Sequence, residues 1–358
     1  MFKVLSILLV FLATLTNYTP FIPIIFLLTV IIFIKKISFK VSELLIYLSL
    51  LVAALVDFMR VATSSFQDIE YNHIVALWFS ISFFFLLLTI YKKEYNRDIF
   101  NYAVKVALVI HVSFWIIQVF SLYAFSYHID PILLFKGYEQ RIWGPELFGI
   151  TIHRASGFAN EPSGYAITVA PLIYLYYLYQ QKITKLISLS LLTMILTFSP
   201  LSWILVFGFL FFVAFQKGNL SLKGAIKTFI LLSPLLYLIT EYLLWRFGDG
   251  EDASLGQRQN AINWLVMQDE TRQLLGSGFG LNDYGGLVAD TSVYFNLFFT
   301  YGIFSVIFFI FPLVLTKWDF RKVSYIYVLF LAKYHFYFLI LWFLFAGTKI
   351  NTIKKEKG

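Results

Sequence analysis

This chain contains no cysteine and few charged residues. None of its 358 residues is a cysteine, which excludes disulfide bonds and thiolate metal sites. Only 13% are charged, against roughly 25% in soluble domains, so the chain cannot cover a globular surface with polar groups. The five histidines form no HExxH pattern, which argues against a metal centre, and we expect no cofactor. No basic face with interleaved aromatics is present, which argues against nucleic-acid binding.

Apolar residues take the place of the missing charge. They make up 59% of the chain, and phenylalanine alone supplies 41 residues. We expect an all-α polytopic membrane protein, a single domain over residues 1–358 with about 11–12 transmembrane helices of ~20 residues each. The expected segments cover residues 3–17, 20–35, 42–61, 72–91, 101–126, 162–180, 183–198, 201–216, 225–245, 291–316 and 322–347.

Basic residues gather in alternate short loops, which gives the expected helices a direction. If the segments alternate, these loops share one side, and the positive-inside rule makes that side cytoplasmic. The net charge of +8 is then an orientation signal. The two long loops, 127–161 and 246–290, face outward. The basic loops contain Lys35, Lys36, Lys40, Lys92, Lys93, Arg97, Lys182, Lys185, Lys217, Lys223, Lys227, Lys317, Arg321 and Lys322.

The last apolar segment leaves one point of topology open. Eleven crossings would place the lysine-rich tail, residues 349–357, outside, against the charge rule. Lys333 and His335 lie near the middle of segment 322–347, and two short re-entrant halves would return the tail to the cytoplasmic side. Ionisable residues inside membrane segments are often functional. Scattered residues such as these and His111 are more often structural, and no central carboxylate chain indicates a proton-coupled transporter.

The first outer loop ends in a dense polar cluster, Arg154–Ala166, with the sequence RASGFANEPSGYA. Pro162 suits the first turn of a helix, and Asn160 is a plausible N-cap. The free N–H groups of that turn, together with Arg154, predict an anion site. Glu161 would repel the anion, pair with Arg154 in the empty site, or act as a base. The alternative is an interfacial Arg–Glu pair that only anchors the loop.

The second outer loop contains a run of helical periodicity. Between Ser254 and Glu270 the apolar residues approximate one helical face, which predicts an amphipathic helix on the membrane surface. Arg258 and Trp264 would flank it near the headgroups. The alternative is a surface helix with a snorkelling arginine and a tryptophan anchor. Arg272 follows near its end.

A glycine-rich stretch, GSGFG, closes this loop at Gly276–Gly280. A nucleotide site is disfavoured because no Lys-Ser/Thr follows and no strand–loop–helix context exists. We expect Gly276 and Gly278 to supply turns with positive φ between the surface helix and the next segment.

These local patterns occur together in one family. The chain resembles the Wzy-type O-antigen and capsule repeat-unit polymerases and, more distantly, the O-antigen ligases. The resemblance covers most of the chain as an architecture and rests locally on two motifs. The first is Arg-x-x-Gly-x-x-x-Glu-Pro-Ser: Arg154, Gly157, Glu161, Pro162 and Ser163. The second is an arginine, a tryptophan and a Gly-x-Gly turn, followed by Tyr-Gly-Ile: Arg258, Trp264, Gly276, Gly278, Tyr301, Gly302 and Ile303.

The resemblance implies a membrane glycosyltransferase with a GT-C-like fold, working outside the bacterial cytoplasmic membrane. Its substrates would be undecaprenyl-diphosphate-linked oligosaccharides, and it would need neither nucleotide sugar nor metal. A chain-length regulator and a flippase of the same pathway are the protein partners it suggests. Polymerase, ligase, and flippase or transporter of the lipid-linked sugar remain alternative functions.

The resemblance also suggests roles for single residues. Arg154 and Arg258 are the first candidates for contacts to the diphosphate, and Arg141 and Arg272 are the second. Positioned arginines stabilise the charge that builds on the leaving diphosphate. Related ligases carry a histidine near the end of the large loop, where this chain has Asp290 instead, which weakens the ligase identity. Glu161 and Asp290 are the candidates for the general base.

Overall fold

The computed structural model describes residues 2–15, 71–91, 94–136, 139–142, 146–147, 150–216, 253–268, 270–278, 291–335 and 338–352, and single positions between 30 and 59. The expected segment 225–245 lies outside these residues, as do most of 20–35 and 42–61. No count of membrane crossings therefore follows from the described part of the chain.

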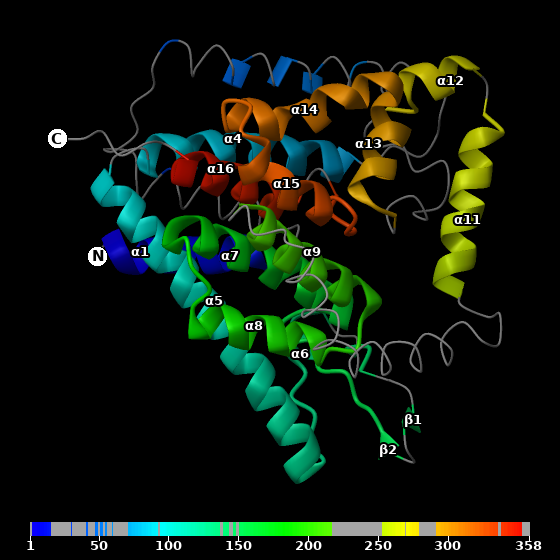
Figure 1. Cartoon of the computed structure of the whole chain (residues 1–358). Coiled ribbons are helices and arrows are strands. Elements are labelled where there is room, and N and C mark those ends of the chain that lie inside the picture. The colour runs from blue at the N-terminus through cyan, green and yellow to red at the C-terminus, as the bar shows by residue number, and fades with distance from the viewer. Residues whose placement is uncertain are drawn as a thin grey trace.

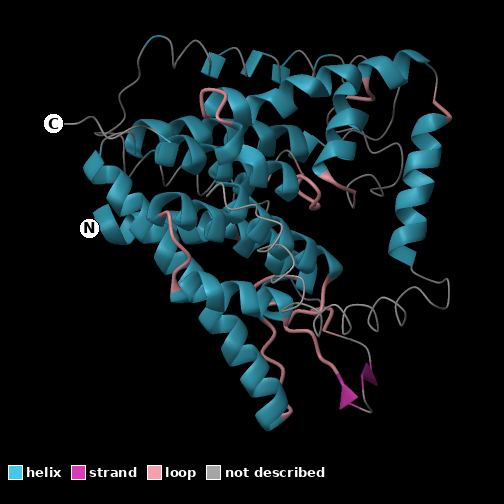
Figure 2. Cartoon of the chain, viewed as in Figure 1, coloured by secondary structure: helices cyan, strands magenta, loops and turns pink. Residues whose placement is uncertain are grey.

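The regular secondary structure of the described residues is helical apart from one pair of two-residue strands. The strands β1 (Glu146–Leu147) and β2 (Ile150–Thr151) pair antiparallel, and both lie in the expected loop 127–161 (Figure 2). The helices are α1 (Phe2–Thr14), α4 (Tyr71–Tyr91), α5 (Glu94–Phe125), α6 (Pro131–Lys136), α7 (Pro162–Gln180), α8 (Lys185–Ile195), α9 (Pro200–Gln216), α11 (Ala253–Val266), α12 (Glu270–Leu275), α13 (Val293–Tyr301), the 3₁₀ helix η4 (Gly302–Ser305), α14 (Val306–Leu315), α15 (Phe320–Leu329) and α16 (Leu339–Thr352).

Three helical stretches in the described residues are long and apolar enough to cross a membrane. They are His73–Tyr91, Tyr95–Phe125 and Val293–Leu315. Large apolar side chains such as Phe120 and Ile307 point away from the rest of the protein and are more than half exposed. Lipid tails can cover such a surface, whereas water cannot do so cheaply. The composition and these helices agree in indicating a membrane protein.

Helix α7 is the centre of the bundle. It packs against α5, α8, α9, α15 and α16, and most of its side chains are buried (Figure 1). A helix that is apolar all round needs either protein or lipid around it, and here the neighbouring helices cover it. At 1.5 Å per residue, the 19 residues of α7 span about 28 Å. The two ends of α7 therefore mark opposite ends of the bundle.

The C-terminal end of α7 lies at the basic end of the bundle, where the described basic loops meet. Near this end, the hydroxyl of Tyr179 donates to Asp98 at the start of α5 (3.1 Å). The amide of Asn101, also early in α5, donates to Asn351 at the end of α16 (2.8 Å). The lysines of the α7–α8 turn follow directly. The described basic loops thus lie at one end of the bundle, and the expectation that all the basic loops share one side of a membrane remains a prediction.

The last apolar segment is two helices rather than one crossing. Helix α15 has 10 residues, about 15 Å, so it is too short to cross a core of about 30 Å. After it, residues 330–335 and 338 are non-helical, and the hydroxyl of Tyr334 there donates to the carbonyl of Ile167 in α7 (2.7 Å). Helix α16 then returns to the basic end, where Lys349 donates to Leu315 (2.8 Å). In the described residues the segment is therefore a helical hairpin, as the re-entrant alternative requires, and its place in the membrane remains a prediction.

The expected segment 291–316 is also interrupted. Helix α13 ends at Tyr301, its C-cap Gly302 has φ of 54° and ψ of −133°, outside the α-helical region, and the chain resumes through η4 into α14. The backbone of residues 276–278 crosses at this point. Ser277 and Gly278 donate their N–H groups to the carbonyls of Phe299 and Thr300 (2.7 and 3.0 Å). Within the second motif, the Gly-x-Gly turn and the Tyr-Gly-Ile sequence are therefore in direct contact.

Candidate functional site

The polar motif of the first outer loop lies at the end of the bundle opposite the basic end. Residues 154–161, the site loop, lead from β2 into α7 and run beside segment 139–142. The N–H of Arg154 donates to the carbonyl of Ile142 (2.7 Å). The N–H of Arg141 donates to the carbonyl of Asn160 (2.9 Å). The structure thus brings two predicted arginines onto neighbouring backbone segments, with Arg154 half-buried and Arg141 exposed.

Two buried glutamines fix the shape of the site loop. The Gln118 Oε1 atom accepts from the N–H groups of Ser156 and Gly157 (3.1 and 2.8 Å). Its amide nitrogen donates to the Gln140 Oε1 atom (2.7 Å). Gln140 in turn donates to the carbonyls of Gly157 and Ala159 (2.9 and 2.6 Å). Losing either amide would leave several buried groups unsatisfied, which is costly. Sequence reasoning missed both residues.

The glycine of the first motif is required by the turn. Gly157 has φ of +60°, the left-handed region that side chains disfavour. A Cβ atom there would also lie 3.0 Å from the ring of Tyr165. The motif glycine therefore gives the site loop its bend and lets it pack on α7.

The start of α7 differs from the predicted cap. The helix begins at Pro162 as expected, but the N-cap is Glu161, so the prediction of Asn160 as N-cap is wrong. The reason is steric: the residue before a proline is driven to an extended backbone, and Glu161 has φ −147° and ψ 160°. The Glu161 carboxylate makes no cap hydrogen bond and instead accepts from the hydroxyl of Ser163.

Glu161 has a cationic partner that the sequence did not indicate. The Lys333 Nζ atom lies 3.9 Å from the Glu161 Oε1 atom. Lys333 belongs to the break between α15 and α16, far away in the sequence. The expected pairing was with Arg154. The two side chains are 19% and 33% exposed, so the pair is partly open to solvent.

His128 adds no positive charge near the site loop. The ring nitrogens of His128, in the loop between α5 and α6, are buried. Desolvation lowers the pKa of His128, and the nearby Asp130 and Gln140 offset that only in part. The imidazole is therefore neutral at physiological pH.

The second outer loop contributes helix α11 to the described structure. Helix α11 runs across the ends of the other helices, at the right-hand edge of Figure 1. A helix is present where we expected one, its lying on a membrane surface remains a prediction, and Trp264 packs on Phe299 of α13, with ring centroids 5.4 Å apart. Ile262 and Val266 are exposed, as a helix lying on a membrane would require.

The candidate residues of that loop are only partly described. Arg258 lies in α11 and Arg272 in α12, but their side chains are outside the described part of the structure. Asp290 lies outside the described residues altogether. Nothing in the described part therefore joins Arg258 to Arg154, and their convergence remains a prediction.

The glycines of the second motif have the conformations that we expected. Gly276 and Gly278 have φ of +76° and +95°. A side chain at Gly276 would clash with the backbone of Thr300 and Gly302, so the two segments cross at glycines on both sides. This close crossing accounts for the glycines of the stretch, and no nucleotide site is needed to explain them.

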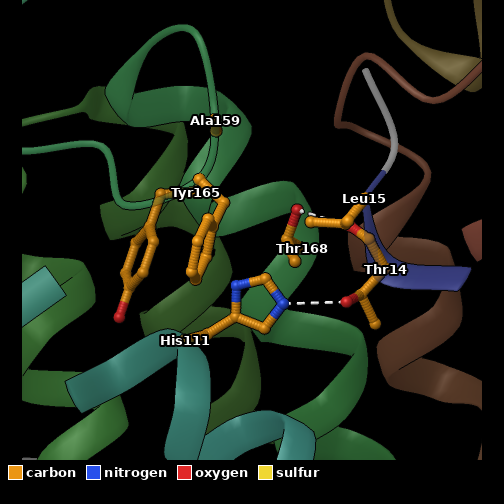
Figure 3. Close-up of a pocket in the computed structure, with 7 residues that line it drawn as sticks. Thr14, Leu15, His111, Ala159, Tyr165 and Thr168 are labelled. Atoms are coloured by element: carbon orange, nitrogen blue, oxygen red, sulfur yellow. Dashed lines mark hydrogen bonds between the residues drawn. The ribbon is translucent and has the colours of Figure 1, made fainter. Parts of the chain in front are cut away.

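A small cavity lies beneath the site loop, between α1, α5 and α7. His111 points across it to Thr14, with 2.8 Å between the His111 Nε2 and Thr14 Oγ1 atoms (Figure 3). The ring of Phe158 stands edge-on to His111 at 5.5 Å. The cavity has room for a single water molecule at most, so it holds no substrate. His111 therefore serves as packing under the site loop, the structural alternative.

Comparison of the chain with protein-family models, curated proteins and solved structures finds no match. The functional argument therefore rests on the chain's own residues and geometry.

Proposed function

We propose that this protein is a polytopic membrane glycosyltransferase with a GT-C-like fold. It would polymerise undecaprenyl-diphosphate-linked oligosaccharide repeat units into O-antigen or capsular polysaccharide, on the outer face of a bacterial cytoplasmic membrane. The observation that carries the proposal is the placement of the Arg-x-x-Gly-x-x-x-Glu-Pro-Ser motif. It forms a braced, partly exposed loop at the end of the bundle opposite the basic end, with the ammonium group of Lys333 beside the carboxylate of Glu161.

The proposed reaction needs two kinds of group. The hydroxyl of an acceptor repeat unit attacks the anomeric carbon of the donor glycan, and the bond from that carbon to the lipid diphosphate breaks. The hydroxyl proton passes to a carboxylate, Glu161 or Asp290. The lipid diphosphate leaves with its bonding electrons, and Arg154, with Arg258 as the second candidate, stabilises its growing negative charge. A loop held by buried amides keeps such groups in position before the substrate arrives.

Profiling the surface glycan of a deletion strain tests this proposal. We expect loss of long chains while single repeat units still reach the surface. Long polymer that accumulates without attachment to its acceptor would identify a ligase instead. Loss of the single-unit product as well would identify a flippase or transporter. An unchanged ladder of chain lengths would contradict all three functions.

The proposed orientation has its own test, which the absence of native cysteine makes simple. Tyr127, after α5, and Lys182, after α7, are both exposed and lie at opposite ends of the bundle. We expect a membrane-impermeant maleimide to label Tyr127→Cys in spheroplasts, and Lys182→Cys only after the membrane is opened. The reverse pattern would place the motif in the cytoplasm and contradict the proposal.

A further inference from the structure

The break between α15 and α16 brings a lysine to the site loop, and the break is firmly held. The N–H of Val293 at the start of α13 donates to the carbonyls of Phe330 and Ala332 (3.0 and 3.2 Å). On the other side of Lys333, the hydroxyl of Tyr334 is anchored to α7, and both Ala332 and Tyr334 are fully buried. The backbone at Lys333 is thus fixed on both sides.

The carboxylate that faces this lysine is fixed as well. Glu161 lies between the braced site loop and the proline that starts α7. The 3.9 Å separation leaves the pair at the outer limit of a direct ion pair, and both groups keep some solvent. A pair of this kind returns little stability. The pair alone therefore adds little to the stability of the fold, and both charged groups are partly accessible from solvent.

From this juxtaposition, and resting on the proposed function, we infer that Lys333 is a ligand of the donor's diphosphate. An ammonium group is a strong phosphate ligand, and a diphosphate carries more negative charge than one carboxylate. Glu161 is the counter-ion of Lys333 in the empty site, and the diphosphate replaces it when the donor binds. Loading of the donor thereby releases the Glu161 carboxylate next to the reacting groups. The hairpin of α15 and α16 would then form a further wall of the site.

Binding of undecaprenyl diphosphate to the purified full chain in nanodiscs tests this inference. We expect Lys333→Ala to weaken binding by about 10-fold, the loss typical of one charged contact, and Lys333→Arg to retain most of it. Lys333→Met keeps the length of the side chain without its charge, and it should behave like Lys333→Ala. The matched control is Lys322→Ala. Lys322 is the other ion-paired lysine of this hairpin, 3.0 Å from Asp319 at the basic end, and its loss should leave binding unchanged.

A double-mutant cycle with Glu161→Gln separates a direct role from an indirect one. If Lys333 binds the diphosphate, Lys333→Met weakens binding in the Glu161→Gln background too. If Lys333 only holds Glu161, the second substitution has no effect there, and the inference is overturned. Full binding by Lys333→Met in the otherwise unchanged chain overturns it as well and leaves the proposed function standing. Failure of the unsubstituted protein to bind the lipid overturns the proposed function itself.

Discussion

Replacing Arg154 with alanine should abolish long glycan chains while single repeat units still appear at the cell surface. The proposed reaction places negative charge on the leaving diphosphate, and removing one positioned cationic donor from such a site typically costs about 100-fold or more in rate. A polymer grows by many successive transfers, so a loss of that size in each transfer removes the long products. Glycan ladders on gels, at matched protein levels, measure the effect.

Two substitutions show whether this effect belongs to the guanidinium group and to its place. Arg154→Lys keeps a positive charge but loses the planar pair of donors, so we expect short chains in reduced amount. Arg321→Ala removes an arginine at the basic end, beyond the far end of α7, and should leave the ladder unchanged. A normal ladder in the Arg154→Ala strain would remove the basis for the proposed diphosphate contact.

Replacing Gly302 with alanine should destabilise the whole protein rather than the reaction alone. With φ of 54° and ψ of −133°, Gly302 occupies a region that is essentially closed to residues with a side chain. A Cβ atom there would also clash with the backbone of Leu274 and Gly276. Strain and clash together should cost about 3 kcal/mol or more. Thermal unfolding of the detergent-solubilised protein, followed by size-exclusion fluorescence, measures the loss.

Gly256 provides the matched control in the same part of the chain. It lies inside α11, is exposed, and has open space where a Cβ atom would be. Alanine is the better helix former, so Gly256→Ala should leave stability equal or raise it by about 0.5–1 kcal/mol. Equal melting temperatures for the two variants would show that the crossing of residues 276–278 with Gly302 does not constrain the fold.

The sequence predicted those helices whose ends carry a local signal. Segment 162–180 matches α7 because Pro162 sets its start, and segment 201–216 matches α9 apart from Pro200, the first residue of the helix. Helix α5 begins at Glu94 instead of residue 101, because a helix can include charged residues that precede its apolar run. The reversal between α15 and α16 was one of two alternatives that the sequence left open, since tertiary hydrogen bonds rather than a proline or glycine hold that break.

The candidate site also contains residues that the sequence predicted and residues that it did not. The residues of the motif were predictable because proline, glycine and arginine act through their own geometry. The approach of Lys333 to Glu161 was not, because it depends on how far α15 extends before the chain turns back. The Gln118–Gln140 pair was hidden for a similar reason: a buried amide in an apolar helix gives no sign of which backbone groups it binds.

The amide bracing of the site loop has a consequence for how the activity should respond to its surroundings. Glutamine side chains and backbone groups carry no net charge and do not titrate, and the bonds of Gln118 and Gln140 are buried. Salt therefore leaves these amide hydrogen bonds unchanged. Any salt response belongs to the ions that the loop holds and to the lipid diphosphate, so activity and thermal stability should depend on salt independently of each other.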